Sequence, residues 1–332
     1  MDLSSYVSDG QYRYYYAQLD KKRQTAYTDL LNGYLEQRSC LFIRVDNMDD
    51  IWDIHRAVCY DVPELFYIKN VRASFNNILH TATVYPEYRF NEETRRNILE
   101  QMEKTSQMLI GRISMLSESE KVKQLHDYLI RLVTYKDVEA PYSHEAPGTL
   151  LYGIGVCEGI AKAFKYLADR VHIESLVAVG KCDNDENAQE GMGHAWNVVY
   201  VDGCPYHLDV TFDYSISSNE IVRYDYYLLS DSQIQADHTY TNLPTCNNSI
   251  EYYDQVGCLV VNKKTLQRLV AKELRPGSTL VFRIPSLFGD KNEIVDVVSK
   301  SIVDAVPLPY AVGHSISLSY NMPRMIFQVQ LI

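Results

Sequence analysis

Hydrophobic residues in the first part of the chain switch between helical and extended spacing. Residues 20–38 and 48–60 carry apolar positions three or four apart, which predicts two amphipathic helices. Short apolar runs predict strands between and after these helices, at 39–44, 65–68 and 78–85. This mixture of helices and short strands favours an α/β region at the amino-terminal end.

The middle of the chain predicts helices followed by a β-hairpin. The pattern turns helical at Asn91, and Ser117 with Glu120 three residues later is typical of a capping box that begins a second helix. An apolar stripe over 160–171 predicts an amphipathic helix. Strands are expected after it, at 175–180, 194–201 and 206–212, the last two joined by the hairpin signal Asp202-Gly203. We interpret the chain as a whole as an α+β protein.

The rest of the chain predicts a linker and a further folded part. Residues 237–250 are polar and are the best candidate linker, and the remainder reads strand, helix, strand, helix, strand, strand. The element order over 279–331 resembles that over 40–85, which raises an internal duplication as one interpretation. We therefore expect three parts, namely an accessory α/β region at 1–116, a core at 117–240 and a second accessory α/β domain at 250–332.

Composition and charge narrow the classes of function. The chain has 332 residues, with 32 Lys and Arg against 43 Asp and Glu and a net charge of −11. This acidic balance argues against nucleic acid as a partner, because phosphate binding needs a basic footprint. No run of about 18 apolar residues is present, so we expect no membrane span. The first residues, MDLSSYVSDG, lack the basic and apolar regions of a secretory signal, and we expect a cytoplasmic protein.

Seven cysteines are scattered along the chain without a CxxC pair, at positions 40, 59, 157, 182, 204, 246 and 258. Their odd number and wide spacing indicate free thiols in a reducing compartment rather than a disulfide framework. Cys157 differs from the others because it follows a glycine-containing turn, Tyr152 to Gly155, and begins the apolar helix. A helix amino terminus stabilises a thiolate, which is the nucleophilic form of cysteine. Cys157 is thus the candidate nucleophile.

A thiol nucleophile needs a histidine base and a third group that orients the histidine. The hairpin supplies both, because a two-residue turn at Asp202-Gly203 would pair His194 with Thr211. Asp209 would then be a diagonal neighbour of His194 on the same face, close enough to accept from its imidazole. The residues alone therefore predict a Cys157, His194, Asp209 triad.

The same stretch resembles a known family. Residues 117–232 resemble the transglutaminase-like superfamily of papain-type cysteine enzymes, through the blocks KVKQLHDYLIRLVTYKD, GVCEGIAKAFKYLADR and GHAWNVVYVDGCPYHLDVTFD. The resemblance implies a papain-like core in which Cys157 is the nucleophile, His194 the base and Asp209 the orienting acid. It also implies amide hydrolysis or acyl transfer on peptide or protein substrates, without a cofactor. Some members of bacterial type have lost activity, so an inactive peptide-binding or protein-binding scaffold is the alternative.

Three other interpretations compete for residues near the triad. His207 shares the parity of His194 and is an alternative base. Cys204 and His207 form a CxxH couple which, with Cys182 and His194, is typical of part of a zinc site. The acidic stretch before His194 predicts an attraction for cationic substrates, through Asp183, Asp185, Glu186 and Glu190.

Overall fold

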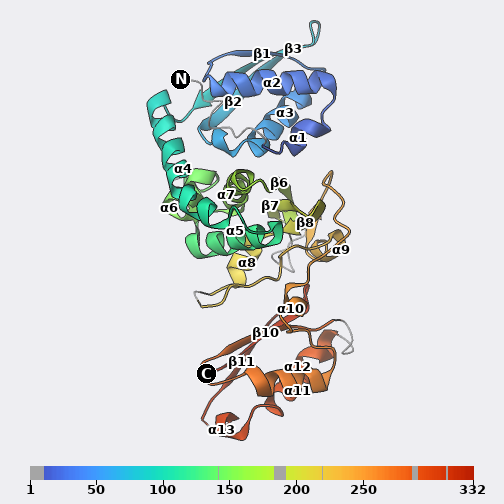
Figure 1. The fold of residues 1–332 in the computed structure, drawn as a ribbon. Helices are drawn as coiled ribbons and strands as arrows, with labels where there is room; N and C mark the ends of the chain where they lie inside the picture. Colours follow the sequence, from blue (N-terminus) through green and yellow to red (C-terminus); the bar gives the residue numbers. More distant parts are fainter. Residues whose placement is uncertain (1–10, 141, 183–191, 219, 286–290, 312) are drawn as a thin grey trace.

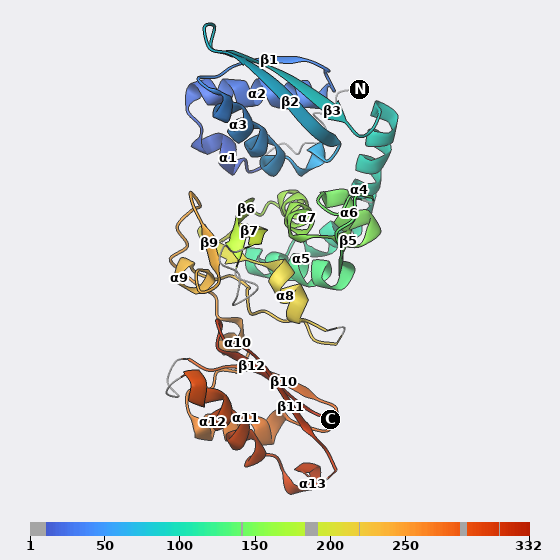
Figure 2. The ribbon, with the colours of Figure 1, turned by 180° about the vertical axis from the view of Figure 1, so that it is seen from behind.

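The computed structural model describes residues 11–140, 142–182, 192–218, 220–285, 291–311 and 313–332. Three parts follow one another along the molecule, with the first strands and helices at one end and the last at the other (Figure 1). Seen from behind, the long helix α4 runs down the side of the first part toward the second (Figure 2). Within the described residues, no helix combines the length and apolar character that crossing a membrane needs.

The N-terminal part is an antiparallel sheet covered by helices, with strand order β1-β3-β2. Its elements are α1 (Tyr14–Gln18), α2 (Lys21–Leu35), β1 (Leu41–Arg44), α3 (Met48–Asp61), the 3-10 turn η2 (Pro63–Leu65), β2 (Ile68–Asn76) and β3 (Thr81–Tyr88). The predicted helices and the strand at 39–44 are confirmed. The strand predicted at 65–68 is wrong for residues 65–67. Pro63 begins a 3-10 turn, and β2 begins only at Ile68.

In the central part, helix α7 lies between other helices on one side and a sheet on the other. Its elements are α4 (Glu92–Ile113), α5 (Glu118–Leu132), β4 (Thr134–Tyr135), α6 (Ala146–Tyr152), β5 (Ile154–Gly155), α7 (Cys157–Arg170), β6 (Ser175–Cys182), β7 (Met192–Val201), β8 (Cys204–Leu208), α8 (Val210–Ile216), α9 (Asp231–Ile234) and β9 (His238–Tyr240). The four-stranded sheet is antiparallel, with order β8-β7-β6-β9. The capping box of Ser117 and Glu120 begins α5 as predicted. The α+β fold class is confirmed.

Two predictions in this region are wrong. The strand expected over 206–212 ends at Leu208, because Asp209 turns the chain and caps α8. The linker expected over 237–250 begins inside the core, since β9 pairs with β6 through Cys182 and His238. Cys246 is also buried, against residues of the same sheet.

Helix α7 joins the first two parts. Its Lys165 is fully buried, lies 2.5 Å from Asp169 and donates to the backbone carbonyl of Tyr12 at 2.9 Å. Gln11 donates to the other oxygen of Asp169 at 3.0 Å. Buried charges persist only when they are paired in this way. One hydrophobic cluster also runs through the N-terminal helices, α4, α5 and α7, so the two parts share a core.

The C-terminal part has a hydrophobic cluster of its own. Its elements are α10 (Tyr252–Gln255), α11 (Lys263–Glu273), β10 (Thr279–Arg283), α12 (Lys291–Val303), α13 (Leu308–Ala311), β11 (Ile316–Asn321) and β12 (Ile326–Leu331). The sheet order β10-β12-β11 matches that of β1-β3-β2, with a helix after the first strand in both cases. The repeated element order seen in the sequence is therefore also a repeated topology. The first strand expected in this part is absent from the described residues, where only a single bridge joins Leu259 to Arg283.

Candidate active site

Cys157 is the first residue of α7, as the sequence predicted. The preceding helix α6 ends at Gly153, which adopts a left-handed φ of 63° that glycine tolerates without strain. The short strand β5 then leads into Val156, which caps α7 without a side-chain hydrogen bond. The first N–H groups of α7 are therefore left for other partners, and the positive end of the helix dipole faces the thiol.

His194 lies on β7 close to the start of the strand. The hairpin has the predicted register, with Val201 opposite Cys204 and Val198 opposite His207. Pairing with β8 ends at Asn197, so His194 does not pair with Thr211 as expected and instead lies opposite Gly180 of β6. The parity argument nevertheless holds, because the side chain of His194 still reaches Asp209.

Asp209 connects the end of β8 to α8. Its Oδ1 accepts the backbone N–H groups of Thr211 and Phe212 at 2.9 and 3.0 Å, which caps the helix. Its Oδ2 lies 2.6 Å from Nε2 of His194. The carboxylate is fully buried, and although burial raises its pKa, the charge and hydrogen bonds of His194 hold that pKa well below its usual range. Asp209 is therefore ionised and fixed in direction.

The thiol and the imidazole shift each other's ionisation. Burial raises the pKa of Cys157, but hydrogen bonding and charge from His194, with the backbone N–H groups of Ala195 and Glu158, bring it below its usual value. Burial lowers the pKa of His194, but the charge and hydrogen bond of Asp209, and then the contact with Cys157, raise it to about 10. These two shifts together favour a thiolate beside an imidazolium.

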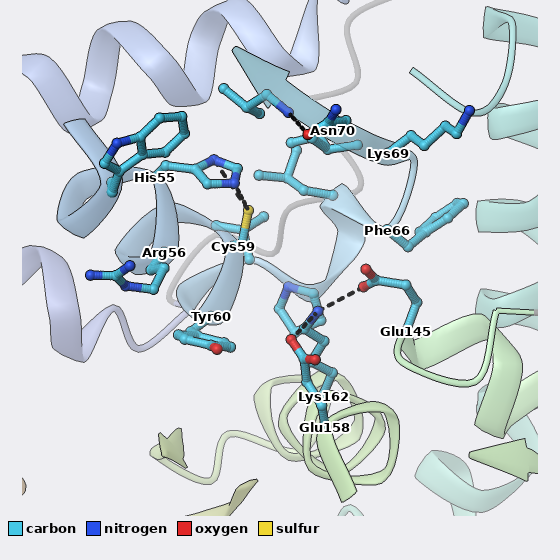
Figure 3. A pocket seen from close by; sticks show the side chains of 16 residues that line it. His55, Arg56, Cys59, Tyr60, Phe66, Lys69, Asn70, Glu145, Glu158 and Lys162 are labelled. Carbon is cyan, nitrogen blue, oxygen red and sulfur yellow. Dashed lines mark hydrogen bonds and ion pairs between the residues drawn. The ribbon is translucent and has the colours of Figure 1, made fainter. Parts of the chain in front are cut away.

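A second cysteine–histidine pair shows the opposite behaviour. Cys59 and His55 lie one turn apart on α3, with Sγ 3.8 Å from Nδ1, in a pocket that is also lined by Lys162 and Glu158 (Figure 3). Burial raises the pKa of Cys59 to about 12 and lowers that of His55 to about 4. Both groups are therefore neutral at physiological pH, so proximity alone does not activate a thiol in this chain.

The hydroxyl of Tyr135, on β4, contacts Cys157. Hydrogen bonding to the backbone and thiol of Cys157 contributes to the pKa of Tyr135, which burial raises above its usual value. The side chain is about half exposed, at 47%. Sequence reasoning missed this residue, since only the parallel pairing of β4 with β5 brings it beside the helix start.

Residues 107–209 match the family model of the Transglutaminase-like superfamily. The central segment is transglutaminase-like. This match ends at Asp209 and includes Cys157 and His194, so the resemblance predicted from the three sequence blocks is confirmed. No curated protein matches the chain.

Three solved structures are similar to parts of the chain. They are a candidate cysteine protease from Cytophaga hutchinsonii (14% identity, 43% of this chain and 62% of that one, TM-score 0.29), a TGase (15%, 61% and 60%, TM-score 0.31) and a candidate protease from Parabacteroides distasonis (15%, 43% and 36%, TM-score 0.26). The chain thus spans less than two thirds of the length of each.

His207, the alternative base, is held away from the thiol. Its Nδ1 accepts the indole N–H of Trp196 at 3.0 Å, and its Nε2 lies 2.9 Å from Asp231 and 3.1 Å from the hydroxyl of Tyr240. Burial lowers its pKa. Neither nitrogen is left to take a proton from Cys157, so the geometry favours His194 in that position.

The zinc interpretation finds no support in the described residues. In two groups of three residues there, the possible metal-ligating atoms lie within 4.8 Å of one another. One group is His194, Asp209 and His238, and the other is His207, Asp231 and Cys246. Neither group includes Cys204. Because Nδ1 of His207 accepts a hydrogen bond, its proton is on Nε2, which cannot then offer a lone pair to a metal. Both groups are explained by hydrogen bonds among their own members.

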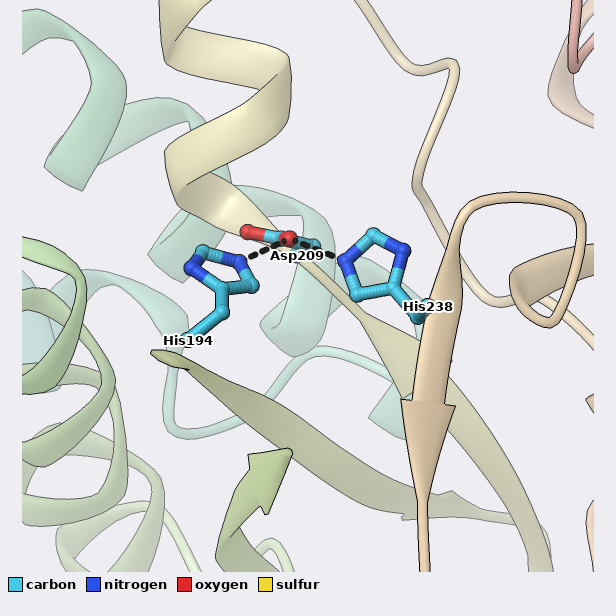
Figure 4. Close-up of side chains that lie close together, drawn as sticks. All are labelled: His194, Asp209 and His238. Atoms are coloured by element: carbon cyan, nitrogen blue, oxygen red, sulfur yellow. Dashed lines mark hydrogen bonds and ion pairs between the residues drawn. The ribbon is translucent and has the colours of Figure 1, made fainter. Parts of the chain in front are cut away.

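Two further points concern residues beyond the triad. The acidic stretch Asp183 to Glu190 lies outside the described residues. His238, which the sequence placed in a linker, lies beside His194 and shares its carboxylate partner (Figure 4). The signal that could have found it is the Asp237-His238 pair close to Thr239 and Tyr240, where a β-branched and an aromatic residue are typical of a strand.

Proposed function

We propose that the protein is a cysteine-dependent enzyme that cleaves amides, or transfers their acyl groups, on peptide or protein substrates. Cys157 is the nucleophile, His194 the general base and acid, and Asp209 the group that orients His194. The observation that carries this proposal is the position of Cys157 at the first residue of α7 together with the 2.6 Å contact between Nε2 of His194 and Oδ2 of Asp209. The pKa shifts of Cys157 and His194, opposite to those of Cys59 and His55, agree with it.

The reaction follows from the arrangement of these groups. The Cys157 thiolate attacks the amide carbonyl carbon and forms a tetrahedral intermediate, whose oxyanion accepts from the backbone N–H of Cys157 at the start of α7. The C–N bond then breaks, and the His194 imidazolium gives its proton to the leaving amine. His194 next takes a proton from water or from an incoming amine, which attacks the thioester and releases the thiolate. We favour hydrolysis over cross-linking, because water needs no acceptor site.

A cleft between the N-terminal and central parts supports a peptide as the substrate. It has a volume of about 680 Å³, lies between α1, α3 and β6, and includes Tyr15, Tyr60 and Val179 in its lining. Tyr60 packs with Cys157 in one small apolar cluster, and Val179 is paired with Ala195 of β7. We propose that an extended substrate lies in this cleft and continues past Tyr60 to Cys157, with the N-terminal part forming one wall.

The cleft itself gives no charge preference. Its arginines, Arg23 and Arg56, are each paired with an aspartate, Asp50 and Asp53. A preference for cationic peptides is therefore proposed from the acidic stretch alone. It would appear as a higher kcat/KM for Lys-containing than for Glu-containing peptides that shrinks as salt is added, because exposed charges are screened.

The proposal is tested by labelling with a thiol-directed activity probe at pH 7, followed by mapping of the labelled cysteine. We expect labelling at Cys157, loss of label and of peptide turnover in Cys157→Ala, and no change in Cys59→Ala, the matched control. A Cys157 that is inert to iodoacetamide at neutral pH would contradict the proposal and favour a binding scaffold. A labelled Cys157 without turnover of any peptide would contradict the substrate class only.

A further inference from the structure

Asp209 serves two histidines with one oxygen. Its Oδ2 lies 2.6 Å from Nε2 of His194 and 3.1 Å from Nε2 of His238, and its Oδ1 is used by the cap of α8 (Figure 4). The two imidazole rings are 5.4 Å apart, centre to centre. The cap of α8 holds Oδ1 in place, so the carboxylate of Asp209 cannot turn. Its Oδ2 therefore links the rings of His194 and His238.

His238 has a carboxylate at each of its ring nitrogens. Nε2 faces Asp209, and Nδ1 lies 2.6 Å from Oδ1 of Asp237. An ionised carboxylate only accepts hydrogen bonds, so both contacts are satisfied at once only when both nitrogens carry protons, that is, when His238 is an imidazolium. Burial lowers the pKa of His238, but hydrogen bonds to Asp209 and Asp237 bring it above its usual value.

The surroundings of His238 keep this arrangement in place. The side chain is fully buried, and its ring centroid lies 4.7 Å from that of Phe212, 5.1 Å from that of Trp196 and 5.8 Å from that of Tyr226. Tyr226 donates its hydroxyl to the second oxygen of Asp237. The other charged or titratable groups near it are His194, His207 and Arg324, the last through Asp237.

We propose that His238 is a positioning residue of the site, a buried imidazolium that fixes Asp209 and limits the negative charge which Asp209 presents to His194. This role rests on the proposed function of His194 as general acid. A full, unshared carboxylate would raise the pKa of the His194 imidazolium further and make proton transfer to a leaving amine less favourable. By sharing Oδ2, His238 brings the pKa of His194 closer to the working pH.

The protonation state of His238 is tested on the wild-type protein by ¹⁵N NMR of labelled histidines between pH 6 and 9. We expect both ring nitrogens of His238 in the protonated range at pH 7, whereas His207 shows one protonated and one unprotonated nitrogen. A neutral His238 at pH 7 would overturn the proposal, whatever the variants do.

The effect on His194 is tested with His238→Gln, since the glutamine amide can still donate to Asp209 without a charge. The readout is the pH dependence of iodoacetamide alkylation of Cys157, which reports the loss of the His194 proton and needs no peptide turnover. We expect that transition to move upward in pKa by about 0.5 or more. His207→Gln, a change at an equally buried histidine of the same sheet, is the control and should leave the transition unchanged.

Three outcomes separate this role from the alternatives. An unchanged transition in His238→Gln, with lower thermal stability, would overturn the proposal and leave His238 structural. A shift in His238→Gln equal to that in His207→Gln would overturn it as well. If the transition moves as expected but no amide substrate is turned over, the positioning role stands and the proposed catalytic function fails.

Discussion

Trp196 donates its indole N–H to Nδ1 of His207 across 3.0 Å, on the sheet that also carries His194. This one hydrogen bond decides which nitrogen of His207 bears the proton and directs that proton to Asp231. His207 is thereby bound into the structure, whereas His194 has one nitrogen on Asp209 and the other free to face the thiol. The two histidines lie on neighbouring strands and have different chemistry.

His194→Ala is expected to lower kcat/KM by about 100-fold or more, because general acid–base catalysis is lost. His207→Ala is expected to keep most of the activity of each folded molecule and to lose stability, by about 1–3 kcal/mol, because the indole N–H and Asp231 lose their partner. Steady-state kinetics on both variants, with the folded fraction measured by circular dichroism, checks this. Equal losses of activity would mean that His207 is the base after all.

Two substitutions at Asp209 separate the effect of its negative charge from that of its helix cap. In Asp209→Asn, the amide oxygen can still cap α8, which places the NH₂ group toward Nε2 of His194 and forces the wrong tautomer on that ring. We expect activity to fall by about 100-fold or more. Stability should fall as well, because the NH₂ group cannot accept from Nε2 of His194 or of His238. Asp209→Ala should lose the same activity and about 1 kcal/mol more stability than Asp209→Asn, from the missing cap. Thermal melts beside kinetics measure the two effects, and full activity in Asp209→Asn would contradict the role of the carboxylate.

The raised pKa of His194 predicts a dependence of stability on pH. With a pKa of about 10 when folded against about 6.5 when unfolded, protonated His194 stabilises the fold fully below about pH 6.5. That contribution is lost as the pH rises through about 10. We expect the Tm of Cys157→Ala to fall between pH 7 and 10 more steeply than that of Cys157→Ala/His194→Gln, both lacking the thiol so that its titration does not contribute. Parallel Tm curves would show that Asp209 does not hold the proton on His194.

Gly159, one turn into α7, sets how closely the preceding loop approaches the nucleophile. A Cβ at this position would lie 2.1 Å from the carbonyl oxygen of Ser143. Gly159→Ala should therefore cost about 1–3 kcal/mol and displace the loop. Gly111→Ala, in α4 with nothing within 4 Å of the new Cβ, should instead stabilise the protein by up to about 1 kcal/mol. Chemical denaturation of both variants checks the sign, and a neutral Gly159→Ala would mean that the loop yields freely.

Local features of the site could be predicted from the sequence, and features that depend on distant partners could not. The turn at Asp202-Gly203 fixes the register of β7 and β8 through parity alone, which is why Asp209 was expected beside His194. The sequence did not predict the helix that begins after Asp209, because Thr211 and Phe212 suit a strand equally well. His238 was missed because a three-residue edge strand has almost no pattern of its own.

The buried ion pair of Lys165 and Asp169 was not predictable for a different reason. Both residues lie on a helix whose apolar stripe predicted one exposed face, yet α7 is buried nearly all round. What covers that face is the N-terminal part, through Gln11 and Tyr12, more than 150 residues away in sequence. Periodicity in one helix cannot show that a remote segment will cover its polar side.

The shared core of the first two parts also defines what can be exchanged between proteins. The family match covers residues 107–209, but the hydrophobic cluster around α7 continues into α2 and α3. A chimera that replaced only the matched segment would cut through this cluster and one wall of the cleft. An exchange of the C-terminal sheet would disturb a separate cluster, and also the contacts of Ile326 and Arg324 with the central part. The part of this chain that could be exchanged as an intact unit is therefore larger than the segment that matches the family model.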